Sequence, residues 1–201
     1  MQESLSVRKV AVLGAGVMGA QIAAHCTNAG IETFLFDLAS EGKDPYAFVK
    51  NSIKNLKKLK PSPLGIEDNA SLLHACQYDN DLERLKDCDL VIEAIAERID
   101  WKEALFKRIT PYLSERAILA TNTSGLSIYS LANILPVALQ TRFCGIHFFN
   151  PPRYMHLAEV IPAPNTSTYL LDALETWLTS YLGKGVVRAK DTPNFIANRI
   201  G

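Results

Sequence analysis

The feature that most constrains this chain is a glycine-rich turn at residues 14–19, where the letters GAGVMG fit the pattern GxGxxG. The turn follows a β-rich run at 8–13 and opens a stretch with helical spacing at 16–30, and a second apolar run follows at 31–37. A strand, a glycine-rich turn, a helix and a strand in this order predict a βαβ unit with a right-handed crossover. Such units build the parallel sheets of α/β proteins.

The positions of this turn have different roles. Gly14 permits the tight turn, Gly16 lets the backbone approach a pyrophosphate, and Gly19 lets the helix pack close to the strand. The helix that starts with Val17 and Met18 offers unpaired N–H groups and a partial positive charge to the pyrophosphate. A lone GxGxxG is a weak signal, but this one has the flanking strand and helix that dinucleotide binding requires. We therefore expect these five residues to bind a dinucleotide.

A carboxylate at the end of the second strand indicates which dinucleotide binds. Asp37 lies 18 residues after Gly19, where a carboxylate hydrogen-bonds the hydroxyls of the adenosine ribose. It would repel a 2′-phosphate, and the next residues, Leu38 and Ala39, offer no arginine to accept one. The cofactor predicted is therefore NAD rather than NADP. The alternative is that Asp37 is only a solvated residue at a strand end.

Strand-like and helix-like segments alternate along the rest of the chain. Strands are predicted at 89–95, 117–121, 142–148, 157–161 and 185–189. Helices are predicted at 45–59, around 66–75, at 100–113 with Asp100 as the N-cap, around 127–134 and at about 167–182. This alternation predicts an α/β fold, a Rossmann-type doubly wound, mainly parallel sheet with helices on both faces.

Composition excludes several classes of protein. Hydrophobic residues make up 48% of the chain, charged residues 21%, and the formal net charge is zero, which is typical of a soluble globular protein without a field for nucleic acid or anionic membranes. No apolar run reaches the roughly 18 residues of a membrane span, and the N-terminus does not resemble a secretory signal. The four cysteines form no CxxC pair, which favours reduced thiols in a cytoplasmic protein. We expect no nucleic-acid partner, no membrane partner and no metal site.

Six motifs occur in order along nearly the whole chain: VAVLGAGVMGAQIA, LVIEAIAE, TNTSGLSI, HFFNPP, AEVI and KDTPNFIANRIG. Together they resemble the 3-hydroxyacyl-CoA dehydrogenase family of fatty acid β-oxidation. The form HFFNPPRYMHLAEVIP is also similar to long bacterial proteins that join this dehydrogenase to an enoyl-CoA hydratase part. The resemblance implies oxidation of an L-3-hydroxyacyl-CoA to the 3-ketoacyl-CoA, with hydride passing to NAD while a base removes the hydroxyl proton.

A histidine and a glutamate are the candidates for proton transfer. His147 ends an apolar run, and histidine is the side chain that most often serves as a general base. Glu159 lies 12 residues further on, inside the next apolar run, where an unpaired carboxylate is costly. A contact between them would fix the imidazole tautomer and stabilise the imidazolium, and the resemblance implies the same catalytic pair. The alternative for His147 is a partly buried structural residue.

Three polar residues are further candidates for the catalytic site. Ser124 follows a strand and can hydrogen-bond the substrate oxygen and contribute to the cofactor site, or it can cap the next helix. Asn150 either braces His147 or holds the thioester region, or it is a turn residue before two prolines. Asn198 corresponds to a family residue that reaches the active site, or it lies on the polar face of a terminal helix.

Three charged residues follow or lie within the strand predicted at 89–95. By resemblance, Glu97 and Lys102 touch the nicotinamide end of NAD, although they could also form an ordinary surface pair. Glu93 lies inside the apolar run, so we expect it near the cofactor crevice or accepting backbone hydrogen bonds. The lysines at 50–60 could meet the phosphates of coenzyme A or line a solvated helix face.

The resemblance also implies a domain organisation. We expect residues 1–190 to form the NAD-binding domain and 191–201 to begin a helical substrate and dimerisation domain that is otherwise absent, so the chain alone would be weak or inactive. The full-length parent is expected to be a homodimer. Asn194 replaces the family's usual glycine and tolerates positive φ. The alternatives are another NAD-dependent hydroxyacid dehydrogenase and a non-catalytic NAD-binding module.

Overall fold

The computed structural model describes residues 5–200, which form one eight-stranded sheet in the order β3-β2-β1-β4-β5-β6-β7-β8. The strands are β1 (Lys9–Leu13), β2 (Glu32–Asp37), β3 (Leu73–Gln77), β4 (Leu90–Glu93), β5 (Ile118–Thr121), β6 (Phe143–Phe148), β7 (Leu157–Pro162) and β8 (Gly185–Arg188). Neighbouring strands run parallel, except that β6 and β7 are antiparallel. The predicted Rossmann-type, mainly parallel sheet is confirmed.

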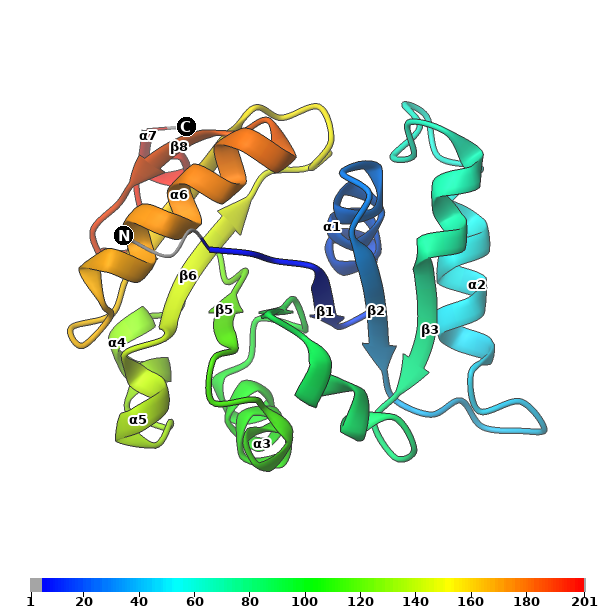
Figure 1. The fold of residues 1–201 in the computed structure, drawn as a ribbon, viewed down its shortest axis with the longest axis horizontal. Helices are drawn as coiled ribbons and strands as arrows, with labels where there is room; N and C mark the ends of the chain where they lie inside the picture. The colour runs from blue at the N-terminus through cyan, green and yellow to red at the C-terminus, as the bar shows by residue number, and fades with distance from the viewer. Residues whose placement is uncertain (1–4, 201) are drawn as a thin grey trace.

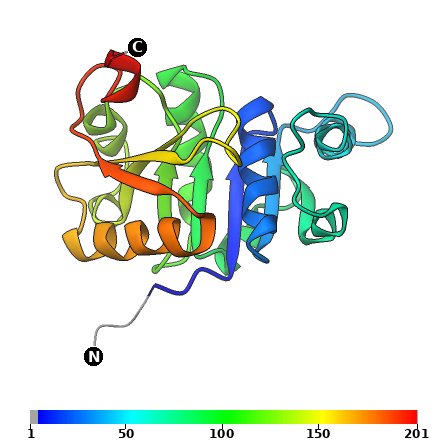
Figure 2. The same ribbon diagram turned by 90° about the horizontal axis from the view of Figure 1, so that it is seen from above.

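Helices cover both faces of the sheet. They are α1 (Val17–Asn28), α2 (Ala47–Leu56), α3 (Ile99–Ile109), α4 (Ile128–Ala132), α5 (Val137–Gln140), α6 (Thr168–Leu182) and α7 (Ala197–Ile200), with short 3₁₀ turns at Glu67–Leu72, Leu82–Asp87 and Thr110–Tyr112. Figure 1 shows α2 and β3 at one end of the sheet and β8 at the other. In Figure 2, α6 lies on the opposite side of the sheet from α4 and α5.

Alternation along the strands explains the two layers of helices. In β1, Val10 and Val12 pack into a core with α1, α2 and α6. The residues between and after them, Ala11 and Leu13, pack into a second core with α3, α4 and α5. Successive side chains of a strand point to opposite faces, so a strand that is apolar at every position must be covered on both faces.

The turn between β1 and α1 needs glycine for two separate reasons. Gly14 has a φ of +109°, and a Cβ there would lie 2.7 Å from the carbonyl oxygen of Ala94. A Cβ on Gly19 would lie 1.8 Å from the carbonyl oxygen of Gly14, because the first turn of α1 packs directly on the loop. Gly16 is different, since a Cβ there would meet nothing within 4 Å.

The structure corrects several predicted elements. The helix predicted around 66–75 is a 3₁₀ turn followed by strand β3, because pairing with β2 overrides the polar local sequence. Arg98, not Asp100, is the N-cap of α3, and Asp100 lies in the first turn, where it accepts hydrogen bonds from the Arg98 guanidinium. The short helix α5 and the 3₁₀ turn at Leu82–Asp87 were not predicted.

The segment after β8 packs against the sheet domain. Asp191 accepts hydrogen bonds from the backbone N–H groups of Ile128 and Tyr129 at the start of α4, and Phe195 is buried. Asn194 has a φ of +64°, so the expectation of positive φ there is confirmed. The domain boundary expected at residue 190 stays a prediction. Residues 1–4 of the first expected domain and residue 201 of the second lie outside the described residues. Between residues 5 and 200, no helix is long and apolar enough to cross a membrane.

Candidate active site

The histidine and glutamate singled out in the sequence lie in direct contact. His147 of β6 is the register partner of Glu159 of β7, and the polar loop between them lets the second strand return antiparallel. The His147 Nδ1 and Glu159 Oε2 atoms are 2.8 Å apart, and the two residues are 5% and 0% exposed. Because the carboxylate holds Nδ1, Nε2 is the ring nitrogen left to exchange a proton with a substrate.

The C-terminal segment completes the surroundings of this pair. The backbone N–H groups of Ile196 and Ala197 each donate to Glu159 Oε1 at 2.9 Å. The rings of Phe149 and Phe195 lie 4.4 Å and 5.7 Å from the imidazole, measured between centroids. The buried carboxylate therefore has a hydrogen-bond partner on each of its two oxygens. Asn198 follows on α7 and is exposed.

The TNTSG turn after β5 is held by Glu97. This carboxylate accepts hydrogen bonds from the backbone N–H groups of Ser124 and Gly125 at 2.9 and 3.0 Å, and from the Thr123 hydroxyl. Ser124 is exposed, and the alternative in which it caps the next helix is wrong, because the Ser127 side chain accepts the capping hydrogen bond of α4. Ser124 is thus presented to solvent by a fixed turn.

Lys102 is a buried cation. Its ammonium lies 2.5 Å from Glu93 Oε1 and 3.7 Å from Glu97 Oε2, and its side chain is 1% exposed, so the surface-pair alternative is wrong for Lys102. Burial alone would raise the pKa of Glu97, but the Thr123 hydroxyl, the Lys102 ammonium and the backbone N–H groups hold it below its ordinary value. Glu93 also accepts a hydrogen bond from the backbone N–H of Ile95, one of the two outcomes expected for it.

Other candidate residues lie around this centre with different partners. Asn150 Oδ1 accepts a hydrogen bond from the Gln21 side chain of α1 at 3.4 Å. Sequence reasoning missed Asn122, whose side chain accepts from the backbone N–H of Phe148 at 2.9 Å and ties the end of β6 to the turn after β5. A polar run directly after a buried strand was the signal for it. In the lysine segment, Lys50 and Lys57 pair with acidic neighbours at the surface.

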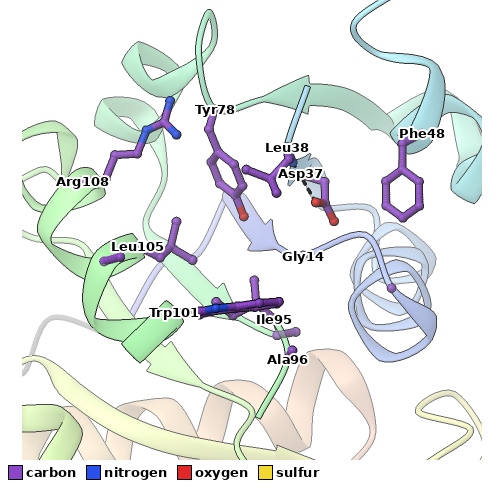
Figure 3. A pocket seen from close by; sticks show the side chains of 13 residues that line it. Gly14, Asp37, Leu38, Phe48, Tyr78, Ile95, Ala96, Trp101, Leu105 and Arg108 are labelled. Carbon is purple, nitrogen blue, oxygen red and sulfur yellow. Dashed lines mark hydrogen bonds between the residues drawn. The ribbon is translucent and has the colours of Figure 1, made fainter. Parts of the chain in front are cut away.

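A hollow of about 420 Å³ lies beside the glycine-rich turn, at the carboxyl ends of β1, β2 and β4 (Figure 3). Its lining is mostly apolar and comprises Gly14, Gly16, Asp37, Leu38, Phe48, Tyr78, Ala94, Ile95, Ala96, Trp101, Ala104, Leu105 and Arg108. The Asp37 carboxylate accepts from the backbone N–H groups of Ala15 and Leu38 at 2.6 and 2.7 Å. Open α/β sheets bind their ligands at this edge.

The hollow and the buried pair lie at the same edge of the sheet. Asp37 ends β2 and His147 is near the end of β6, with β1, β4 and β5 between them. Sequence reasoning missed Tyr78 and Trp101 in the hollow. Tyr78 directly follows β3, so the wrongly predicted helix hid it; the short run LHACQ was the available signal.

Comparisons with known proteins agree with this geometry. The family described as "3-hydroxyacyl-CoA dehydrogenase, NAD binding domain" matches residues 9–192. A "Putative fatty acid oxidation complex trifunctional enzyme" of Rickettsia prowazekii is 44% identical over 97% of the chain, which spans 27% of that protein. A "Probable 3-hydroxyacyl-CoA dehydrogenase" of Deinococcus radiodurans is 40% identical over 98% of the chain, which spans 57% of it.

Solved structures show the same fold. The (S)-3-hydroxybutyryl-CoA dehydrogenase of Ralstonia eutropha is 34% identical with a TM-score of 0.81, and the match covers 97% of this chain and 68% of that one. The 3-hydroxybutyryl-CoA dehydrogenase of Escherichia coli is 33% identical with a TM-score of 0.83, and the match covers 98% of this chain and 41% of that one. NAD, the cofactor predicted from Asp37, is the one that the matching family names. The chain belongs to the 3-hydroxyacyl-CoA dehydrogenase family, within its NAD-binding domain.

Proposed function

We propose that this chain contributes the NAD site and the proton-transfer pair of an enzyme that oxidises L-3-hydroxyacyl-CoA to 3-ketoacyl-CoA. One observation carries the proposal: the buried contact between His147 and Glu159 lies at the same sheet edge as a glycine-rich turn of the dinucleotide-binding type. An acyl-CoA substrate, a homodimeric full-length protein and a cytoplasmic location are parts of the same proposal.

The two residues of the proton-transfer pair have different roles. His147 Nε2 accepts the proton of the substrate hydroxyl as that oxygen becomes a carbonyl oxygen, and returns it in the reverse direction. Glu159 holds Nδ1 at 2.8 Å, which orients the ring and stabilises the imidazolium that forms. Ser124 donates a hydrogen bond to the substrate oxygen from its exposed turn. Asn150 braces His147 or holds the acyl thioester region, and Asn198 reaches the same site from α7.

The residues around the glycine-rich turn fit NAD. The free space at Gly16 lets a pyrophosphate approach the backbone at the start of α1, which Val17 and Met18 open. Gly14 and Gly19 make that turn possible, and Asp37 accepts from the adenosine ribose. When bound, NAD supplies the hydride acceptor. Because Lys102 is buried, we assign it to fixing Glu97, which in turn holds the turn of Ser124.

A pair of variants tests the proposal in the full-length parent protein, because residues 1–201 alone are expected to be weak or inactive. His147→Gln and Glu159→Gln should each lower the single-turnover rate of acetoacetyl-CoA reduction by about 10²-fold or more, because proton transfer contributes about 10²–10⁴-fold. The affinity for NADH, measured by calorimetry, should stay within about twofold because neither residue lies at the turn. Glu115→Gln, at an exposed position, is the matched control.

The outcomes separate the candidate functions. Absence of NADH binding by the wild-type chain contradicts the whole proposal. Turnover retained by His147→Gln removes that residue from the mechanism. NADH binding with no turnover of acetoacetyl-CoA in the full-length parent protein would favour the non-catalytic NAD-binding module instead. Turnover of a free hydroxyacid but not of the CoA ester would favour another hydroxyacid dehydrogenase.

A further inference from the structure

The loop between β6 and β7, residues 149–156, carries two groups of the proposed active site. The ring of Phe149 lies 4.4 Å from the imidazole of His147, measured between centroids, and Asn150 follows directly. Two backbone hydrogen bonds to the carbonyl oxygen of Pro151, at 3.0 and 2.9 Å, close a turn within the loop. These local bonds shape the loop but cannot hold it against the rest of the molecule. Its position therefore depends on contacts from outside.

The first outside contact comes from a buried lysine. Lys184 follows the C-terminal end of α6, and the residue is 2% exposed. Its ammonium donates to the carbonyl oxygen of Pro152 and, at 2.8 Å, to that of Met155. Directly after it, the backbone N–H of Gly185 donates to the carbonyl oxygen of His156 at 2.9 Å. Three hydrogen bonds thus join the β6–β7 loop to the segment between α6 and β8.

The charge of Lys184 is compensated in an unusual way. Among the described residues, no carboxylate forms an ion pair with its ammonium. Burial alone lowers the pKa of Lys184 below its ordinary value, and taking a charge out of water is costly unless polar partners replace the water. A methionine of similar length would avoid this cost, but it could not donate to two carbonyl oxygens. The partners that offset the burial are therefore those in the loop.

A second outside contact is made by Arg153 of the loop itself. Its guanidinium donates to the carbonyl oxygens of Ser62 and Leu64, both at 2.8 Å. These carbonyls belong to the segment 61–65, which Asn28 near the end of α1 fixes through two hydrogen bonds of 2.8 Å. The loop is thus tied to α1 through Arg153 and to the end of α6 through Lys184.

We propose that Lys184 and Arg153 are positioning residues that hold residues 149–156 in the place required for turnover. Phe149 then stays against the imidazole, and Asn150 stays within reach of the substrate. The inference rests on the proposed function, because it gives the position of the loop a role in that reaction. Neither cation lines the hollow at the carboxyl ends of β1, β2 and β4. Their loss should therefore affect turnover and leave NADH binding intact.

Lys184→Met in the full-length parent protein is the first test, because it keeps the size of the side chain and leaves two loop carbonyl oxygens without a donor. The kcat of acetoacetyl-CoA reduction should fall about tenfold or more, since a shift of about 1 Å can cost about 10²-fold. The Kd of NADH, measured by calorimetry, should not change. Lys86→Met, which removes an exposed ammonium, is the matched control and should keep both values.

Hydrogen exchange separates local displacement from general destabilisation. In Lys184→Met, the amides of residues 154 and 155, which close the turn of the loop, should lose protection. The amides of α3 should keep theirs, because that helix has no contact with Lys184 among the described residues. Loss of protection in both places to the same extent would mean that Lys184 only stabilises the fold, and would overturn its positioning role.

Arg153→Gln tests the second contact at a half-buried position, where folding depends less on the side chain. Because Lys184 still holds the loop, kcat should fall by a smaller factor, about three- to tenfold, as loss of a charged hydrogen bond does. NADH affinity should again be kept. Arg116→Gln, at an exposed position, is the matched control.

The outcomes keep this inference apart from the proposed function. Absence of turnover by the wild-type parent protein would overturn the proposed function and this inference with it. Turnover by the wild type and an equal kcat in Lys184→Met would overturn this inference alone. If Lys184→Met failed to fold, a wild-type kcat in Arg153→Gln would overturn it as well. Lower kcat in both variants with NADH affinity kept supports it.

Discussion

At the scale of single residues, the candidate site depends on buried charges that each have a close partner. Glu159 is hydrogen-bonded to His147 and to two backbone N–H groups, and Lys102 lies against Glu93. Taking charges out of water costs several kcal/mol per ion unless partners compensate. The second pair makes no contact with the imidazole, yet through Glu97 it fixes the turn that presents Ser124.

Lys102→Met tests this second pair. The variant leaves Glu93 buried without its cation, so the free energy of unfolding in urea should fall by about 3–5 kcal/mol. Lys107→Met, on the same helix, breaks an exposed pair with Glu103 and should cost less than about 1 kcal/mol. The double variant Glu93→Gln/Lys102→Met should lose less than the sum of its single changes. Equal losses for the two lysine variants would mean that burial does not govern the pair.

At the scale of elements, prediction from sequence succeeded where the signals are local. The helix predicted at 167–182 is found at Thr168–Leu182, since Ser167 supplies its cap and Gly183 its left-handed end. Strand β3 was missed because it forms by pairing with β2, which lies far from it in the sequence. The missed strand also hid Tyr78, whose place at the carboxyl edge follows only once β3 is known.

The glycines of the first β–α turn should differ in whether their substitution affects stability or NADH affinity. Gly16→Ala adds a methyl group that meets nothing in the protein, so the midpoint of thermal unfolding should not change. It occupies the space where a pyrophosphate would approach, and NADH affinity should fall about tenfold or more. Gly14→Ala should lower the midpoint itself, because its Cβ would lie 2.7 Å from a carbonyl oxygen at a φ of +109°. Unchanged NADH affinity in Gly16→Ala would contradict pyrophosphate binding at this turn.

At the scale of the whole molecule, one sheet edge gathers parts that are far apart in the sequence. The turn after β1, the end of β2, the turn after β5 and the β6–β7 pair all reach it. Motif order could predict this gathering, because parallel strands bring their carboxyl ends together. It could not predict the burial of Lys102 or the contact of residues 196 and 197 with Glu159, which depend on side-chain packing.

A histidine of α1 contacts the end of α6 on the same face of the sheet, which makes the stability of the molecule depend on pH. His25 of α1 contacts the carbonyl oxygen of Leu182 at the end of α6 through Nε2, at 2.9 Å. Burial, opposed by this hydrogen bond and aided by the charges of Lys184 and Arg153, lowers the pKa of His25 from 6.5 to about 4. The folded state therefore binds fewer protons than the unfolded state between these values.

The stabilising contribution of neutral His25 is complete above about pH 6.5 and is lost as the pH falls towards 4. Urea unfolding from pH 7.5 to pH 4.5 should show the wild type losing up to about 3 kcal/mol more than His25→Gln, whose amide can keep the hydrogen bond without titrating. If the wild type and His25→Gln lost stability in parallel over this range, the join between α1 and α6 would not be the group that titrates.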